Sequence, residues 1–141
     1  MAHTAKLLIR DVVTAVKNDT ISSAAKMMKK ANIGCVVVVD GKKPIGIFTE
    51  RDMINRVVAE GVDPMKTTLA KVMTGNPIVV DSAEPLDRVF SLLAEGRFRH
   101  VPITDSGNLV GIVSLSDIAK VLKPVFQEDK YTQYFVDFLD K

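Results

Sequence analysis

Hydrophobic and polar positions along the chain follow one plan that is used twice. In the first half, apolar residues recur at helical spacing over 21–31, and a continuous apolar run over 35–39 follows. This order predicts an amphipathic helix and then a strand that is buried on both faces. After a polar turn, a second strand is predicted over 44–48, and a second helix then ends near Gly61.

The second half repeats this plan at a constant offset of 65 residues and without a gap. Its first helix is predicted over 86–93, and its second helix is predicted to end at Pro124. Short strands are predicted ahead of the first helix of each half, over 12–14 and 77–80. Identical residues that the offset brings together include Val36 with Val101, Asp40 with Asp105, Gly46 with Gly111 and Asp52 with Asp117.

The repeated unit therefore reads β-α-β-β-α. Because a unit of about 60 residues buries little apolar surface by itself, the two units are expected to pack together around a pseudo-twofold axis. The predicted fold is α/β in the broad sense, an α+β arrangement of two repeats with an extra C-terminal helix. We place the first repeat at 8–60, a linker at 61–70, the second repeat at 71–123 and a tail at 124–141.

The tail departs from the repeat because it is rich in aromatic residues. Five of the eight aromatic residues follow residue 125, and Tyr131, Tyr134, Phe135 and Phe138 share one face of a predicted helix. We favour the interpretation that this face packs on its own domain. The alternative is that it packs on a second copy of the chain.

Composition narrows the functional classes. Hydrophobic residues make up 47% of the chain, which suffices for a packed core, and a net charge of +2 offers no bulk attraction to nucleic acid or membranes. The single cysteine, Cys35, lies in an apolar run and is expected to be buried and inert. The first residues lack the order of a signal peptide and no apolar run spans a bilayer, so we expect a soluble, cytoplasmic protein.

A seven-residue motif closes the second strand of each half, over 46–52 and 111–117. The hydroxyl groups of Thr49 and Ser114, each with an acid three residues later, are typical of a capping box at a helix start. Capping does not explain the glycine that opens each motif, since glycine weakens a strand unless another group approaches its backbone closely. A helix N-terminus can also bind phosphate, so the motif is a candidate ligand site.

Basic residues near the motif favour an anionic ligand. Arg51 lies within the first motif, and Arg97, Arg99 and His100 precede the strand that begins at Val101. Guanidinium groups match phosphate oxygens in a two-pronged geometry, and an aspartate at a helix start suits a ribose diol. Together these residues indicate a site for a nucleotide monophosphate and its sugar, although His100 by itself could equally be a hydrogen-bonded structural histidine.

The ordered pair of motifs resembles a pair of CBS domains. The resemblance rests on the tandem copies, on the segment Met73-Thr74-Gly75-Asn76-Pro77 that opens the second half and on both seven-residue motifs, and it covers residues from about 8 to 122. It implies a Bateman module that binds an adenosine-containing ligand such as AMP, ADP or ATP in one or both of two clefts between the repeats. Some members of the family bind S-adenosylmethionine or NADH instead.

The resemblance also implies which residues line each cleft, with Asp52 or Asp117 on the ribose hydroxyls. The first set is Thr49, Arg51, Asp52, Asn76, Pro77, Ile78, Arg99, His100, Val101 and Pro102. The second set is Val12, Val13, Thr14, Cys35, Val36, Ser114, Ser116 and Asp117. Ser116 and Cys35 stand where the first set has Arg51 and His100, so phosphate binding is expected mainly at the first cleft.

No catalytic or metal site is predicted. The sequence has no cysteine–histidine cluster of metal spacing, no nucleophile elbow and no Walker-type glycine loop. Asp52 and Asp117 could be imagined as a catalytic pair, but the repeat symmetry gives each of them its own equivalent site. We therefore expect a protein that is not an enzyme.

The favoured function is a stand-alone adenine-nucleotide sensor for AMP, ADP or ATP. Its output would pass in trans to an effector protein of unknown identity, or through a homodimer. The resemblance to CBS domains implies that the helices after Thr49 and Ser114 would form the contact of such a dimer. The alternative is a structural scaffold with vestigial clefts that dimerises through the aromatic tail. Nucleic-acid binding through Arg97 and Arg99 is a third hypothesis, disfavoured by the small net charge and the lack of an aromatic stacking platform.

Overall fold

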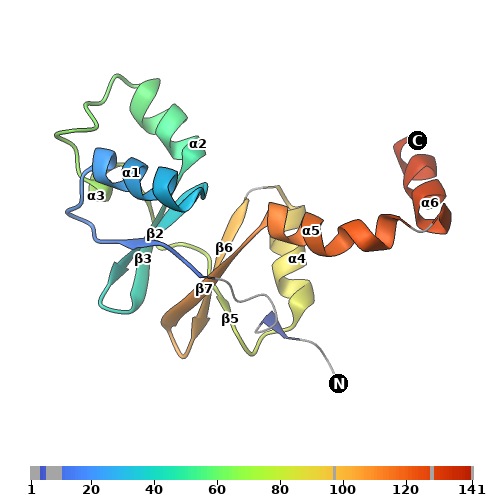
Figure 1. Ribbon diagram of the computed structural model, residues 1–141. Helices are drawn as coiled ribbons and strands as arrows, with labels where there is room; N and C mark the ends of the chain where they lie inside the picture. The colour runs from blue at the N-terminus through green and yellow to red at the C-terminus, as the bar shows by residue number, and fades with distance from the viewer. Residues whose placement is uncertain (1–3, 6–10, 97, 128, 141) are drawn as a thin grey trace.

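Two sheets flanked by helices form the body of the molecule (Figure 1), whose computed structural model describes residues 4–5, 11–96, 98–127 and 129–140. Both halves contain the order β-α-β-β-α, and one further helix follows at the C-terminal end. The predicted fold class, two such repeats with an extra C-terminal helix, is confirmed.

The first sheet has four strands in the order β1-β2-β3-β4, with β1 parallel to β2 and the other pairs antiparallel. The strands are β1 (Thr14–Ala15), β2 (Cys35–Asp40), β3 (Lys43–Thr49) and β4 (Thr74–Gly75). The helices of this half are α1 (Ile21–Ala31), α2 (Glu50–Asp52), its π-helical continuation η2 (Met53–Val58), and α3 (Leu69–Val72).

The second sheet has three strands in the order β5-β6-β7, with β5 parallel to β6 and β6 antiparallel to β7. Its strands are β5 (Val80–Asp81), β6 (His100–Asp105) and β7 (Asn108–Ser114). The helices of this half are α4 (Leu86–Ala94), α5 (Leu115–Phe126) and α6 (Asp129–Leu139).

The strand register repeats at the offset found in the sequence. Cys35 pairs with Thr49 between β2 and β3, and His100 pairs with Ser114 between β6 and β7. Both hairpins also shift register at equivalent positions along their strands. The duplication therefore extends to the pattern of main-chain hydrogen bonds.

Strand β2 is buried on both faces, as its unbroken apolar run predicts. Val36 and Val38 pack in the core of the first repeat, whereas Cys35 and Val37 cluster with Ile112 of β7. Successive side chains point to opposite sides of a strand, so β2 serves both the core of its own repeat and the contact between repeats.

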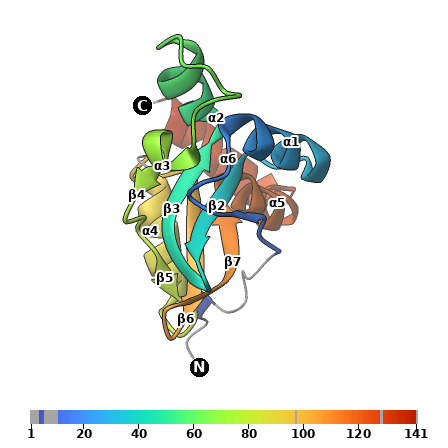
Figure 2. The ribbon, with the colours of Figure 1, turned by 90° about the vertical axis from the view of Figure 1, so that its left-hand side faces the viewer.

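The two sheets meet in the middle of the molecule (Figure 1 and Figure 2). Strand β3 contacts β7, and the Leu109 N–H donates a hydrogen bond of 2.8 Å to the carbonyl oxygen of Lys42. The predicted packing of one repeat against the other is thereby confirmed.

Several element boundaries differ from the prediction. The opening strands begin only at Thr14 and Val80, because only two residues of each find a parallel partner in β2 or β6. Helix α5 continues through Pro124, although a proline inside a helix removes one N–H donor. Helix α3 begins within the predicted linker, where Leu69 is fully buried. The predicted start of the first repeat, residues 8–10, lies outside the described residues.

The aromatic tail does not lie on its own domain, which corrects the favoured interpretation. Helix α5 leads away from the sheets and α6 lies at its far end (Figure 1), with Tyr134 and Phe138 exposed by 75% and 67%. The 12 residues of α5 span about 18 Å, which carries α6 beyond the reach of both cores. None of the helices in the described part of the chain is long and apolar enough to cross a membrane.

Candidate functional site

A cleft of about 310 Å³ opens between the two repeats, beside the start of α2. Its walls come from three segments: the end of β3 with α2, the stretch around β4 that leads into the second repeat, and the stretch that leads into β6. The lining residues are Ile47, Thr49, Glu50, Arg51, Asp52, Thr74, Asn76, Pro77, Ile78, Phe98, Arg99, His100 and Pro102.

Nine of the ten residues predicted for the first cleft line it. The exception is Val101, which is 1% exposed and belongs to the core of the second repeat. Because side chains alternate along β6, His100 and Pro102 face the cleft while Val101 faces away from it. Arg97, which the sequence groups with Arg99, lies outside the described residues.

The start of α2 is held by the capping box that the motif predicts. Thr49 Oγ1 accepts a hydrogen bond of 3.2 Å from the Asp52 N–H, and Asp52 Oδ2 accepts one of 3.0 Å from the Thr49 N–H. These reciprocal bonds fix the side chain of Asp52, which is only 15% exposed, at the wall of the cleft. The carboxylate is therefore presented in one orientation.

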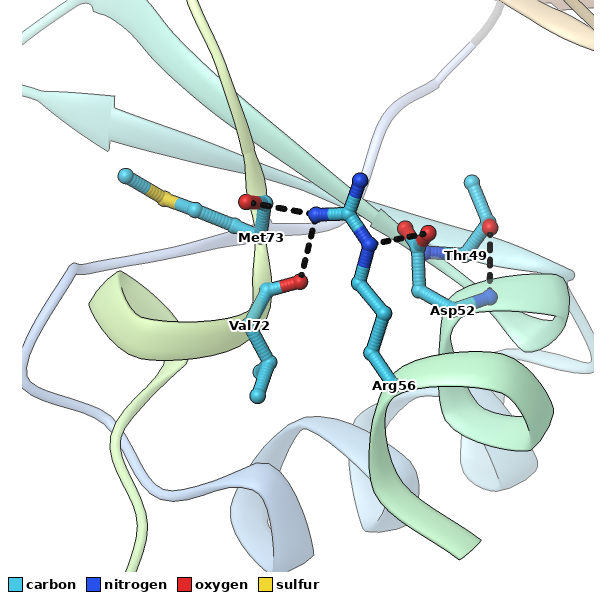
Figure 3. A network of polar contacts seen from close by, with 5 residues as sticks. All are labelled: Thr49, Asp52, Arg56, Val72 and Met73. Carbon is cyan, nitrogen blue, oxygen red and sulfur yellow. Dashed lines mark hydrogen bonds and ion pairs between the residues drawn. The ribbon is translucent and has the colours of Figure 1, made fainter. Parts of the chain in front are cut away.

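Arg56 holds Asp52 from the other side, and sequence reasoning missed it (Figure 3). Its Nε lies 3.6 Å from Asp52 Oδ1, and its Nη1 donates to the carbonyl oxygens of Val72 at 3.1 Å and Met73 at 3.0 Å. The i,i+4 spacing of Asp52 and Arg56 could have indicated the ion pair. The carbonyl contacts join residues 16 and 17 positions apart, so no local pattern predicts them.

Gly46 makes room for a protein side chain, and the group that approaches its backbone closely is Met73. A Cβ atom at Gly46 would lie 3.0 Å from Met73 Cγ and would also collide with the sulfur of that side chain. Gly46 is not among the residues that line the cleft. The glycine is therefore explained by the path of Met73 across β3.

The cleft carries charges of both signs. Arg51 from the first repeat and Arg99 from the second supply guanidinium groups, while Glu50 and Asp52 supply carboxylates. Glu50 was not predicted as a lining residue, and its N–H donates a hydrogen bond of 2.9 Å to the carbonyl oxygen of Gly34. Positive charge from both repeats thus reaches the same space.

The setting of His100 favours its neutral form. Burial lowers its pKa, Arg99 lowers it further, and the carboxylates of Glu50 and Asp117 oppose the shift. His100 Nδ1 is buried and has no hydrogen-bond partner among the residues that the structure describes. The predicted burial of Cys35 is confirmed, and that burial, with Glu50 adding to it, raises the pKa of its thiol to about 12.

Four lining residues were not predicted, namely Ile47, Glu50, Thr74 and Phe98. Ile47 could have been found, because it lies two residues before Thr49 and alternate residues of a strand share one face. Thr74 begins the short strand β4 and Phe98 lies in a loop, and in both places the sequence does not specify the path of the chain.

The first-repeat residues predicted for the second cleft are mostly committed to packing. Val36 belongs to the first core, and Cys35 belongs to the cluster between the repeats. Val13 packs against the core of the first repeat, and Val12 packs against the cluster between the repeats. Thr14 is exposed and pairs with β2.

The second-repeat residues predicted for this cleft form another capping box. The Asp117 N–H donates to Ser114 Oγ at 3.2 Å, and the Ser114 N–H donates to Asp117 Oδ2 at 3.0 Å. Ser116 Oγ lies 2.8 Å from Ser114 Oγ. The predicted capping role of the second motif is thereby confirmed, whereas its role toward a ligand remains a prediction.

A family model for the CBS domain matches residues 5–59 and 69–124, once for each repeat. The chain belongs to the CBS-domain family. An uncharacterised protein of Methanopyrus kandleri is 36% identical over 114 residues, which are 79% of this chain and 58% of that protein. The CBS domain-containing protein YhcV of Bacillus subtilis is 34% identical over 119 residues, 84% of each chain. The chain spans only 19% to 22% of three Arabidopsis thaliana relatives that it matches.

Solved structures of CBS proteins share this fold. A CBS domain pair in complex with 5′-methylthioadenosine and S-adenosyl-L-methionine has a TM-score of 0.77 and 30% identity, covering 88% of this chain and 98% of that one. A CBS domain protein from Pyrobaculum aerophilum complexed with AMP has a TM-score of 0.73 and 28% identity, covering 82% and 88%.

The cleft of this CBS pair offers three kinds of contact. The guanidinium groups of Arg51 and Arg99 can pair with phosphate or carboxylate oxygens, and the carboxylate of Asp52 can accept hydrogen bonds from hydroxyl groups. Pro77 and Ile78 add apolar surface, and Ile78 is 44% exposed. The cleft therefore suits a small anion that also carries hydroxyl groups and a flat apolar part.

Proposed function

We propose that the protein is a regulatory module that binds an adenosine-containing nucleotide in this cleft, with AMP preferred over ADP and ATP. The observation that carries the proposal is the convergence of Asp52, Arg51 and Arg99 from both repeats on one cleft. The cleft volume of about 310 Å³ lies at the lower end of the range for small-molecule sites, roughly 300–1,000 Å³. A nucleoside monophosphate suits that size better than a dinucleotide does.

In the proposed complex, each part of the nucleotide has its own partners. The ribose hydroxyls donate to Asp52, whose carboxylate oxygens keep lone pairs free beside their bonds to the Thr49 N–H and the Arg56 ion pair. The phosphate lies between Arg51 and Arg99, and the base covers the apolar surface of Pro77 and its neighbours. The two arginines supply the positive charge in this arrangement, since burial lowers the pKa of His100 and so disfavours its charged form.

The structural relatives support an adenosine-containing ligand without specifying which one. One relative was solved with AMP, and another with 5′-methylthioadenosine and S-adenosyl-L-methionine. S-adenosylmethionine and NADH therefore belong in the same binding experiment as the adenylates.

Binding would act as a signal because the ligand touches both repeats. A ligand that contacts Asp52 and Arg99 together favours the arrangement of repeats in which both contacts form. We propose that an effector protein, which the chain does not identify, reads this arrangement in trans. The role is regulatory and not catalytic in this proposal.

The test is thermal unfolding of the full chain with AMP, ADP, ATP, S-adenosylmethionine and NADH, each added separately. At a hundredfold excess over its dissociation constant, a ligand that binds only the folded state adds about 2.7 kcal/mol of stability. We expect AMP to raise the unfolding midpoint most. We expect Asp52→Asn to abolish this shift.

The matched control is Asp117→Asn, because Asp117 has the same capping role at the start of α5. Both variants should lose stability without ligand, Asp52→Asn somewhat more because Asp52 also pairs with Arg56. Only Asp52→Asn should lose the AMP response. If no ligand at millimolar concentration shifts the wild-type midpoint, the sensor hypothesis is wrong and the scaffold hypothesis takes its place.

Self-association is the second candidate function, and specific exposed residues favour it. Ile54 and Val58 on η2 are 61% and 71% exposed, and the α6 aromatics are exposed as well. We propose a homodimer. Sedimentation of the Ile54→Asp and Phe138→Ser variants distinguishes a dimer that forms through η2 from one that forms through the C-terminal tail. Dissociation by Ile54→Asp places the contact on η2, dissociation by Phe138→Ser places it on the tail, and a monomeric wild type excludes both.

A further inference from the structure

Arg56 joins two walls of the cleft that are distant in sequence (Figure 3). Its Nε lies 3.6 Å from the carboxylate of Asp52, at the wall formed by α2. Its Nη1 donates to the carbonyl oxygens of Val72 and Met73, directly before the wall formed by residues 74–78. One guanidinium group therefore makes three contacts with both walls, although Arg56 itself does not line the cleft.

The second wall depends on the placement of Met73. The Met73 N–H donates a hydrogen bond of 2.8 Å to the carbonyl oxygen of Leu69, and its side chain crosses β3 at Gly46. Three residues later, the Asn76 N–H donates one of 3.1 Å to the carbonyl oxygen of Ile45. Between these points Thr74 and Gly75 pair with β3, so this wall is held to the sheet on one side. The carbonyl oxygen of Met73 has Arg56 as its partner, and loss of the arginine therefore releases the wall from the α2 side alone.

We propose that Arg56 is a positioning residue, which sets the spacing between Asp52 and residues 74–78 before a nucleotide enters the cleft. The inference rests on the proposed function for the identity of the ligand. The ordering of the two walls is a property of the free protein, and it can be measured without any ligand.

This arrangement is specific to the first repeat. The 65-residue offset places Val121 at the position equivalent to Arg56, and valine carries no guanidinium group. A guanidinium group is also required, because it can point one N–H at a carboxylate while another reaches carbonyl oxygens. A lysine ammonium group cannot span the same three acceptors.

The experiment compares wild type with Arg56→Ala, Arg56→Lys and a matched control, Arg88→Ala. Arg88 forms the same kind of i,i+4 ion pair, with Glu84 at 3.9 Å, on a helix that contributes nothing to the cleft. Amide hydrogen exchange of each free protein is measured first, and the dissociation constant for AMP is then measured by calorimetry.

In the free protein, Arg56→Ala should accelerate exchange at residues 73–78 about tenfold relative to the rest of the chain, which corresponds to about 1.4 kcal/mol. The same variant should weaken AMP binding about tenfold, because the ligand must then order this wall as it binds. Arg56→Lys should recover part of both effects, and it also serves if Arg56→Ala fails to fold. Arg88→Ala should change neither.

Two results would overturn the inference. The first concerns amide exchange at residues 73–78 in Arg56→Ala. If this exchange is unchanged, Arg56 does not order the wall, and if it accelerates only as much as exchange in the rest of the chain, Arg56 merely stabilises the fold. The second is an unchanged dissociation constant for AMP in a folded Arg56 variant. If wild type does not bind AMP at all, the proposed function fails, and exchange alone decides whether Arg56 orders the walls.

Discussion

Substitution of Gly46 by alanine tests how the chain is packed beside the cleft. The added Cβ would lie 3.0 Å from Met73 Cγ and 3.1 Å from Met73 Cε, and it would overlap the sulfur between them. Three consecutive heavy atoms of one side chain would have to move together. The backbone of Met73 resists that movement, because its N–H is bonded to Leu69 and its carbonyl oxygen to Arg56.

The expected cost follows from two opposing terms. Overpacking of a filled site costs about 1–3 kcal/mol, whereas replacing glycine by alanine reduces the entropy of the unfolded chain by the equivalent of about 0.4–1 kcal/mol. We therefore expect Gly46→Ala to lower the free energy of unfolding by about 1–2 kcal/mol. Gly75 is the matched control, because it pairs with Gly46 across β3 and β4 and has no atom within 4 Å of an added Cβ.

The assay is urea unfolding at equilibrium, with the free energy taken from the midpoint and the slope. Gly75→Ala should be neutral or slightly stabilising. In a Met73→Ala background, Gly46→Ala should cost much less, since the obstructing side chain is gone. If Gly46→Ala equals wild type in stability, or if its cost is the same in both backgrounds, contact with Met73 does not explain the glycine.

Two further predictions concern titratable groups near the contact between the repeats. Because burial lowers the pKa of His100 below its usual 6.5, the unfolded state binds more protons than the folded state as pH falls through that value. At pH values below about 6.5, the free energy of unfolding should therefore decrease as the pH falls. His100→Asn should remove part of this decrease, and parallel curves of stability against pH for the two proteins would contradict the assignment to His100. The pKa of about 12 and the burial of Cys35 predict that its thiol reacts with Ellman's reagent at pH 8 far more slowly in the native protein than in urea. Equal labelling rates would show that the thiol is accessible.

Local order was determined by the sequence itself. The 65-residue duplication predicted the shared order of elements, and β2–β3 and β6–β7 do pair in equivalent registers. The capping boxes at Thr49 and Ser114 were predicted from residues three positions apart. Such features depend on neighbours in the chain, so the spacing of residue types is enough to specify them.

Part of the candidate cleft could be predicted from the two motifs and from their resemblance to CBS domains. Thr49, Asp52 and Arg99 line the cleft as expected, but Val101 faces the core, because the alternation of β6 assigns it to the opposite face. The contribution of Glu50 was missed, since the capping pattern gives no indication of which side chain at a helix start turns toward the other repeat.

The tertiary structure alone decided which distant groups meet. Arg56 reaches carbonyl oxygens 16 and 17 residues further along the chain, and the Met73 side chain crosses β3 at Gly46. Likewise, the length and direction of α5 leave the aromatic face of α6 exposed, although its helical spacing resembles that of a packed helix. These outcomes depend on the path of the folded chain in space, and the order of residue types along a sequence does not encode that path locally.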